Sequence, residues 1–115
     1  MVCLDSCCEF FIAPEATSTE ASPYFNFEVS ANGTMLVYFC QPELDTMTPL
    51  PDYEWAAIKM AASLVETAGT PIFPEITEPT TWQIEYHLPW TLFSKYFGTA
   101  APTAGEGYSA NFCES

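Results

Sequence analysis

The stretch Tyr24-Phe25-Asn26-Phe27-Glu28-Val29, followed by Asn32-Gly33 and then by Thr34 to Phe39, decides the fold of this chain. In its first part apolar residues alternate with polar ones, which is the period of a half-buried β-strand. Asn-Gly is the dipeptide typical of a two-residue type I′ turn, and an apolar run returns after it. The pattern predicts a β-hairpin whose phenylalanines and Val29 face a core, while Tyr24, Asn26 and Glu28 face away from it.

Three further segments have the pattern of strands. Val2 to Ala13 is short, apolar and aromatic and is closed by Pro14, which predicts a buried strand. From Trp82 to Leu88 apolar and polar residues alternate, and the same period recurs from Tyr108 to Cys113. Between these two, Trp90 to Tyr96 is expected to form a single helical turn after Pro89 that packs Leu92 and Phe93.

Most of the remaining chain is predicted to form loops. Proline, glycine or acidic residues interrupt every pattern in Glu15 to Pro23, Gln41 to Asp52 and Gly69 to Thr81. In Ala57 to Val65 a helical and an alternating spacing compete, and the residues alone leave both open. Five or six short strands separated by turns predict an all-β, antiparallel β-sandwich of jelly-roll type in one domain over residues 1–115. Because strands lie within a few residues of both termini, we expect a truncated domain that lacks some terminal strands.

The composition excludes several classes of partner. The chain has 115 residues, of which 49% are hydrophobic, enough for one core. Fifteen acidic residues against two basic ones give a net charge of −13, which disfavours nucleic acid and anionic membrane surfaces. No apolar run approaches the roughly 20 residues that span a bilayer. A neutral sugar is indifferent to this charge. We predict no cofactor; surplus carboxylates could attract Ca²⁺, but no residues can be assigned to it.

The five cysteines give no metal site. Cys3, Cys7 and Cys8 crowd the first strand, where Cys7 and Cys8 point to opposite faces and cannot converge on one ion. Structural or free thiols are therefore favoured, and disulfides that involve Cys40 or Cys113 are the alternative.

Two arrangements could in principle support catalysis. The single histidine, His87, lies on the polar face of its strand, and no nucleophile motif accompanies it, which favours a surface histidine. Glu9 and Glu28 could form the carboxylate pair of a glycoside hydrolase if their strands are neighbours. In a chain this acidic, however, such a pair is expected by chance, so we predict no enzyme and keep the hydrolase as the least favoured alternative.

A sugar-binding site requires fewer specific groups than a catalytic site. It needs aromatic faces for the apolar sides of a pyranose and planar polar side chains for its hydroxyls. The faces opposite the predicted core carry suitable polar side chains, namely Glu9, Asn26, Glu28, Ser109 and Asn111. Solvated residues on an open sheet are the alternative interpretation of the same pattern.

At this point the chain resembles carbohydrate-binding family 9. The resemblance is carried in collinear order by Asp5-Ser6 with Glu9-Phe10-Phe11, Tyr24-Phe25-Asn26-Phe27-Glu28, Asn32-Gly33-Thr34, Ser63-Leu64, Trp82-Gln83-Ile84-Glu85-Tyr86, Leu88-Pro89-Trp90, Leu92-Phe93 and Gly107-Tyr108-Ser109-Ala110-Asn111-Phe112. It implies a non-catalytic β-sandwich that binds mono- or oligosaccharides, usually at glycan ends. It also implies an accessory role in glycan degradation or uptake, an extracellular or cell-surface location, and a tethered catalytic domain in the full-length parent.

Carried over by position, the resemblance makes Glu9 a sugar-hydroxyl acceptor. It puts Asn26 and Glu28 on the sugar-contacting positions of their strand, and Ser109 and Asn111 on outward positions of the later strand. It also favours a strand for Ala57 to Val65.

The chain also departs from the family pattern. The stacking aromatic of the first strand falls on Cys3, and the second clamping aromatic belongs to a region after Ser115. We therefore expect weak sugar binding or none from this chain alone, with Tyr24 or Trp90 as substitute platforms or, alternatively, as packing residues. A sandwich that has lost binding and serves as a structural or protein-contact domain is the second hypothesis.

Overall fold

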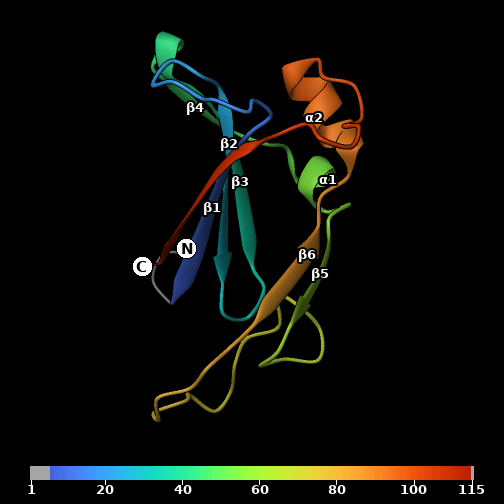
Figure 1. Cartoon of the computed structure of the whole chain (residues 1–115). Coiled ribbons are helices and arrows are strands. Elements are labelled where there is room, and N and C mark those ends of the chain that lie inside the picture. The colour runs from blue at the N-terminus through green and yellow to red at the C-terminus, as the bar shows by residue number, and fades with distance from the viewer. Residues whose placement is uncertain (1–5, 115) are drawn as a thin grey trace.

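The computed structural model describes residues 6–114, and residues 1–5 and 115 lie outside the described part. Of the strand predicted from Val2, the first residues therefore lie outside it, as does Cys3. Within residues 6–114 seven strands, two α-helices and one 3-10 turn follow one another (Figure 1), namely β1 (Cys7–Ala13), β2 (Tyr24–Ser30), β3 (Met35–Gln41), the 3-10 turn Pro42–Leu44, β4 (Thr46–Pro49), α1 (Asp52–Trp55), β5 (Lys59–Ala62), β6 (Ile84–His87), α2 (Trp90–Phe97) and β7 (Ser109–Glu114).

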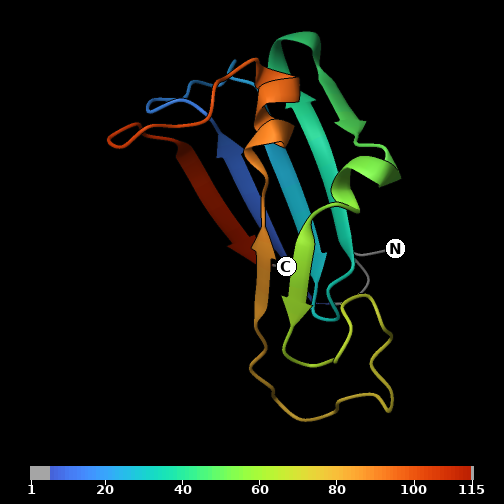
Figure 2. The ribbon, with the colours of Figure 1, turned by 90° about the vertical axis from the view of Figure 1, so that its right-hand side faces the viewer.

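Five of the strands form one antiparallel sheet. Its order is β4-β3-β2-β1-β7, so the predicted hairpin supplies the centre and β7 lies at an edge. β5 and β6 form a separate two-stranded antiparallel sheet. In Figures 1 and 2 this small sheet and α2 lie together on one face of the larger sheet. The prediction of an all-β antiparallel sandwich is confirmed.

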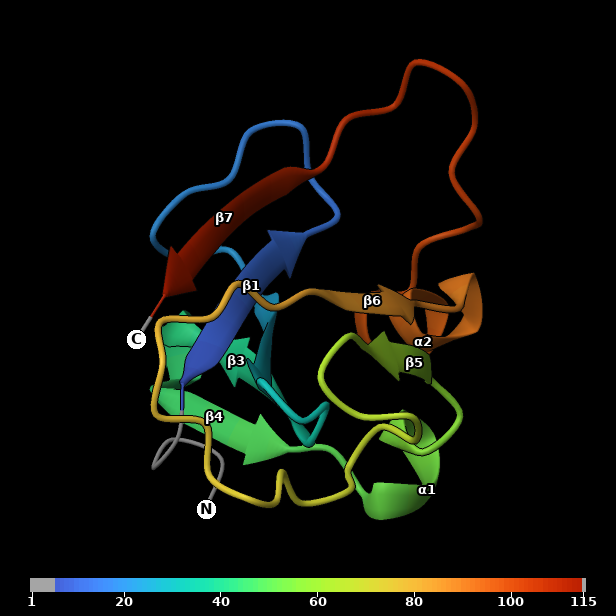
Figure 3. The same cartoon turned by 90° about the horizontal axis from the view of Figure 1, so that it is seen from below.

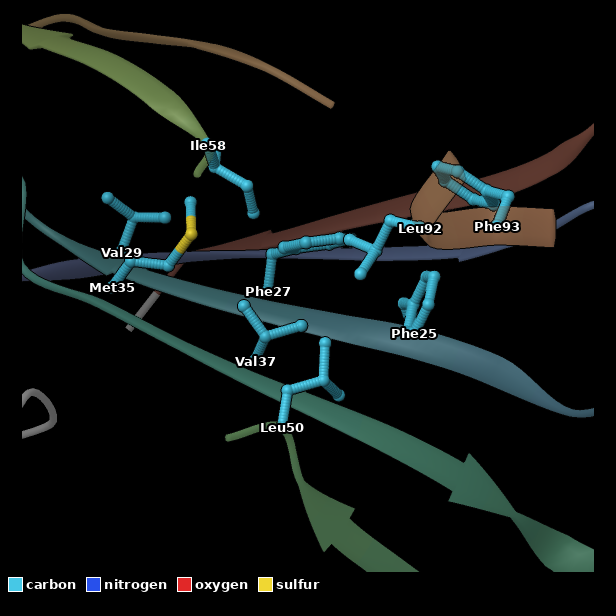
Figure 4. Close-up of a cluster of buried hydrophobic side chains, with 9 residues drawn as sticks. All are labelled: Phe25, Phe27, Val29, Met35, Val37, Leu50, Ile58, Leu92 and Phe93. Carbon is cyan, nitrogen blue, oxygen red and sulfur yellow. The ribbon is translucent and has the colours of Figure 1, made fainter. Parts of the chain in front are cut away.

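The core lies between the two layers. Phe25, Phe27 and Val29 of β2 are 0% exposed, and they point to the same side as Met35 and Val37 of β3 (Figure 4). Burying a side chain of this size stabilises a fold by about 1.5–3 kcal/mol. From the other layer the cluster is completed by Ile58, Leu92 and Phe93.

Helix α2 closes one end of the core. The rings of Phe25 and Phe93 lie edge to face with centroids 5.2 Å apart. Packing of Leu92 and Phe93 is as predicted, but the helix has eight residues rather than one turn. It ends at Gly98, whose φ of 69° is the left-handed conformation that suits a helix C-terminus.

The β2–β3 connection corrects the predicted turn type. A type I′ turn needs positive φ at both central residues, but Gly33 has φ 84° and Asn32 is not among the positive-φ residues. The Gly33 N–H donates to the Ser30 carbonyl, and the Ser30 N–H donates to the Thr34 carbonyl. The loop thus has three residues and ends in a left-handed glycine. The Asn32 side chain accepts the Thr34 N–H at 3.1 Å, which supports this longer turn.

One other prediction is also corrected, and one open alternative is resolved. Gln41 to Asp52 is not one loop, because Thr46–Pro49 pairs with β3 as an edge strand. An edge strand tolerates the proline that argued against a strand. In the ambiguous segment, Lys59–Ala62 is a strand, as the family resemblance favoured, whereas Trp55 ends the short helix α1.

Candidate functional site

The outer face of the five-stranded sheet, opposite the core, collects all five predicted site residues. The register aligns Glu9 with Glu28 across β1 and β2. It aligns Phe11 with Asn26 on one side and with Asn111 on the other, and it aligns Ala13 with Ser109. Since alternate residues share a face, these side chains belong to one surface.

Within this surface the five residues differ in exposure. Asn111 is exposed and Glu9 and Ser109 are half-buried, but Asn26 and Glu28 are only 4% and 8% exposed. The prediction that β2 is buried on one face only is wrong. β2 is the central strand, and Phe11 of β1 and Tyr38 of β3 flank Asn26 in the register. Large neighbours on both sides cover a short side chain between them.

A hollow of about 200 Å³ lies at one end of the outer face. Phe11 and Tyr24 line it with rings 6.0 Å apart at 61°, and Ser109 and Asn111 line it from β7. The loop between β1 and β2 supplies Ser18, Thr19 and Ser22. Burial, with a smaller effect of Cys40, raises the pKa of Tyr24, which keeps its phenol neutral at physiological pH. The hollow therefore combines aromatic walls with neutral hydroxyl and amide groups.

Hydrogen bonds hold the loop of this hollow in place. The Ser22 hydroxyl donates to a Glu15 carboxylate oxygen at 2.9 Å and accepts the Thr19 N–H at 2.9 Å. The Ser109 hydroxyl donates to the Glu15 carbonyl at 2.6 Å, which joins the loop to β7. Ser109 is thus already engaged in positioning the loop, and the Asn111 Oδ1 accepts the N–H of the next residue at 2.9 Å. The Asn111 amide N–H groups have no partner among the described residues.

Beside the hollow lies a cluster of Glu9, Asn26 and Glu28. A hydrogen bond with Glu28 is the main cause that raises the pKa of Glu9, followed by burial and the charge of Glu28, while the Asn26 amide lowers it. The Asn26 Nδ2 donates to the Glu28 Oε1 at 3.5 Å. The Asn26 Oδ1 is buried without a hydrogen-bond partner in the part of the chain that the structure describes. The two carboxyl groups therefore form a direct pair with an unsatisfied acceptor next to it.

The sequence itself decides the family. Residues 1–115 match the sequence model described as carbohydrate-binding family 9. The chain belongs to carbohydrate-binding family 9. Searches of curated proteins and of solved structures give no match. Membership supports carbohydrate binding by a non-catalytic module, whereas the predictions of truncation and of the individual sugar contacts stay predictions.

Three aromatic residues of this family 9 module were not among the predicted contacts. Phe11 and Tyr38 flank Asn26 on the outer face, and Tyr24 was considered only as a substitute platform. Phe11 could have been predicted from the sequence, because it follows Glu9 by two residues and therefore lies on the same face of the strand. The other proposed platform, Trp90, lies away from the hollow and contacts Phe93 and Tyr108 with ring centroids 6.0 and 6.1 Å apart.

Other chemistries find little support in the module. His87 is exposed and pairs with Lys59 across the small sheet. Residues 6–114 contain no group of three or more His, Cys, Asp or Glu side chains that could hold a metal ion. Cys8, Cys40 and Cys113 are free thiols. Between Ser6 and Glu114 no helix is long and apolar enough to cross a bilayer.

Proposed function

We propose that this module binds neutral saccharides on the outer face of its five-stranded sheet, at the hollow between Phe11, Tyr24 and Asn111. The observation that carries the proposal is the strand register. It places the ring of Phe11 between Asn26 and Asn111, next to the carboxyl groups of Glu9 and Glu28. A pyranose presents apolar C–H faces and a rim of hydroxyls, and this surface offers a partner for each.

The unsatisfied Asn26 Oδ1 supports a hydroxyl-bearing ligand. A buried acceptor without a partner costs about 1–3 kcal/mol, so a donor that reaches it recovers part of that free energy. Its neighbours in the register are Phe11 and Tyr38, so a sugar hydroxyl that reaches it has to enter between these two residues. Glu9 and Glu28 are further acceptors in the same row of the sheet.

The size of the hollow suggests a small ligand and modest affinity. Its 200 Å³ is below the roughly 300–1,000 Å³ of sites for drug-sized molecules, which suits one sugar ring at a glycan end. Phe11 and Tyr24 supply the aromatic surface that the residue at Cys3 does not. We therefore propose weak binding that needs no cofactor.

Weak binding to a glycan is useful when it holds another domain near that glycan. A module of this kind keeps a tethered catalytic domain near its glycan, so we propose an accessory role in glycan degradation or uptake. Such a role is exercised outside the cell or at its surface, where polymeric glycans are met.

A calorimetric titration with neutral mono- and oligosaccharides tests the proposal. Tyr24→Ala should weaken binding by about 2- to 12-fold, the equivalent of about 0.5–1.5 kcal/mol for an aromatic contact. Trp90→Ala is the matched control, because this ring is 49% exposed but lies away from the hollow. Equal loss in both variants, or no heat with any neutral glycan, would contradict the proposal and leave a structural or protein-contact domain as the better hypothesis.

The positions of the Glu9 and Glu28 carboxyl groups do not favour a glycoside hydrolase. Retaining and inverting glycosidases hold their carboxyl groups about 5–5.5 Å or about 6.5–9.5 Å apart, with the reacting sugar between them. Glu9 and Glu28 instead lie directly opposite each other on neighbouring strands, Glu28 is the main cause that raises the pKa of Glu9, and Glu28 is only 8% exposed. A chromogenic glycoside should therefore show no turnover, and turnover that disappears in Glu28→Gln would revive this alternative.

A further inference from the structure

A second and larger hollow lies at the opposite end of the molecule from the loop between β1 and β2. Its volume is about 610 Å³, three times that of the outer-face hollow. It lies between the long β5–β6 connection, residues 63–83, and the end of the sheet where Ser6 and the β2–β3 turn meet. Seen from below in Figure 3, the connection, yellow to gold, passes around that end of the sheet. We name this hollow the end cleft.

The connection is fastened at its base and near its middle. Ser63 and Gln83 are joined by two hydrogen bonds, from the Ser63 N–H to the Gln83 carbonyl at 2.9 Å and from the Gln83 N–H to the Ser63 hydroxyl at 2.7 Å. The Gly69 N–H donates to the Asn32 carbonyl at 2.7 Å. A Cβ at Gly33 would lie 2.8 Å from the Ala68 Cβ, so the connection and the turn are in close contact there. These contacts close the base of the connection and hold its first part against the β2–β3 turn.

The lining of the end cleft combines apolar and acceptor groups. Trp82 is half-buried at its base, and two carboxylates extend from the connection. The Thr80 hydroxyl donates to the Glu78 carbonyl, which fixes the backbone between them. The side chains that matter are Leu64, Ile72, Glu75, Glu78, Thr80 and Trp82. Among the described residues that line the cleft there is no Lys, Arg or His, so the lining favours a ligand with hydrogen-bond donors and apolar faces over an anion.

We propose that the end cleft is a second binding site, for a neutral oligosaccharide. Its volume falls within the range of about 300–1,000 Å³ typical of small-molecule sites. A donor-rich basic peptide would also match the carboxylates. Protein partners, however, usually bury about 800 Å² of a broad surface, which a cleft of this size does not offer. Size therefore favours a small ligand, such as a saccharide of a few rings, over a folded protein, and binding of a short basic peptide is an outcome of the test below.

Titration of the whole chain with a monosaccharide and with neutral β-1,4-linked glucan and xylan hexasaccharides tests this site. Trp82→Ala should weaken hexasaccharide binding about tenfold and leave monosaccharide binding unchanged. Phe73→Ala is the matched control, because Phe73 belongs to the same connection, is 93% exposed and does not line the cleft. Tyr24→Ala should instead weaken monosaccharide binding, and it should leave the effect of Trp82→Ala on hexasaccharide binding unchanged, which separates failure of this site from failure of the outer-face site.

A second variant keeps the test decisive if Trp82→Ala proves unfolded by circular dichroism. Glu75→Gln with Glu78→Gln retains the shape of the cleft but removes its charged acceptors, and it should weaken the hexasaccharide several-fold. Hexasaccharide binding that survives both changes would overturn the proposal. So would tight binding of a lysine-rich hexapeptide that is lost in the double variant and in high salt, with no saccharide binding at the cleft.

Discussion

Replacing Glu28 by glutamine should raise the thermal stability of the module at neutral pH and have almost no effect near pH 4. Glu9 and Glu28 lie directly opposite each other on β1 and β2. At neutral pH the two carboxylates repel each other at close range, whereas a glutamine at position 28 could donate its amide N–H to Glu9. At low pH the protonation of Glu9, whose pKa is raised, removes this repulsion in the wild type.

The raised pKa of Glu9 determines at which pH this pair stabilises the fold. The pKa of Glu9 is raised above the ordinary 4.5, first because its protonated form can donate a hydrogen bond to Glu28. The stability that this pair contributes is therefore fully present below about pH 4.5 and is lost as the pH rises through the folded pKa. Like charges opposite each other on neighbouring strands cost about 0.2–1 kcal/mol.

This free energy converts into a measurable change in melting temperature. Unfolding entropy is about 2.1 cal/mol/K per residue, or about 240 cal/mol/K for 115 residues. The Glu28→Gln variant should then melt about 1–4 °C higher than wild type at pH 7. The assay is differential scanning calorimetry between pH 4 and pH 8.

The control is Glu85→Gln, which removes the same charge from an exposed position on β6. Any general relief of the net charge of −13 will be common to both variants. A gain in Glu28→Gln that is the same at pH 4 as at pH 7, or that Glu85→Gln reproduces in full, would refute the reasoning.

Three further changes test the fold around the site. Phe25→Ala should lower the free energy of unfolding by about 3–5 kcal/mol in a urea titration, because the ring is 0% exposed; a loss below 1 kcal/mol would contradict the described core. Gly33→Ala should destabilise by more than about 1 kcal/mol in the same assay, because its φ is 84° and the new Cβ would meet Ala68 at 2.8 Å. Ser109→Ala should cost about 0.5–1.5 kcal/mol and speed amide hydrogen exchange in residues 15–22, because it removes the bond to the Glu15 carbonyl; unchanged exchange there would show that this bond does not hold the loop.

The sequence was sufficient for the elements whose local signals agree. In β2 the alternation of phenylalanines, the following Asn-Gly and the returning apolar run all favour a hairpin, and the hairpin is central in the sheet. The shared face of Glu9, Asn26 and Asn111 follows from the same period of two. Edge strand β4 was missed because Pro42 and Pro49 break the pattern, and only pairing with β3 reveals it.

What the sequence could not supply was the lateral order of the strands. The burial of Asn26 depends on Phe11 and Tyr38 lying on either side of it, and those residues are distant in the chain. The turn type was missed for a different reason. Asn-Gly favours type I′, but the Asn32 side chain bonds to the Thr34 N–H and so supports a three-residue loop. The end cleft likewise forms only where the β5–β6 connection meets Ser6 and the β2–β3 turn.

The pairing of β1 with β7 has a consequence for biosynthesis. Cys8 pairs with Glu114, and about a hundred residues of chain separate these partners. At about 5–20 residues per second, a ribosome delivers β7 some 5–20 s after β1 has been made. During that interval β1 carries an open edge that incoming strands of other nascent chains can join. Association between nascent chains at this edge is therefore favoured until β7 has been made and has closed it.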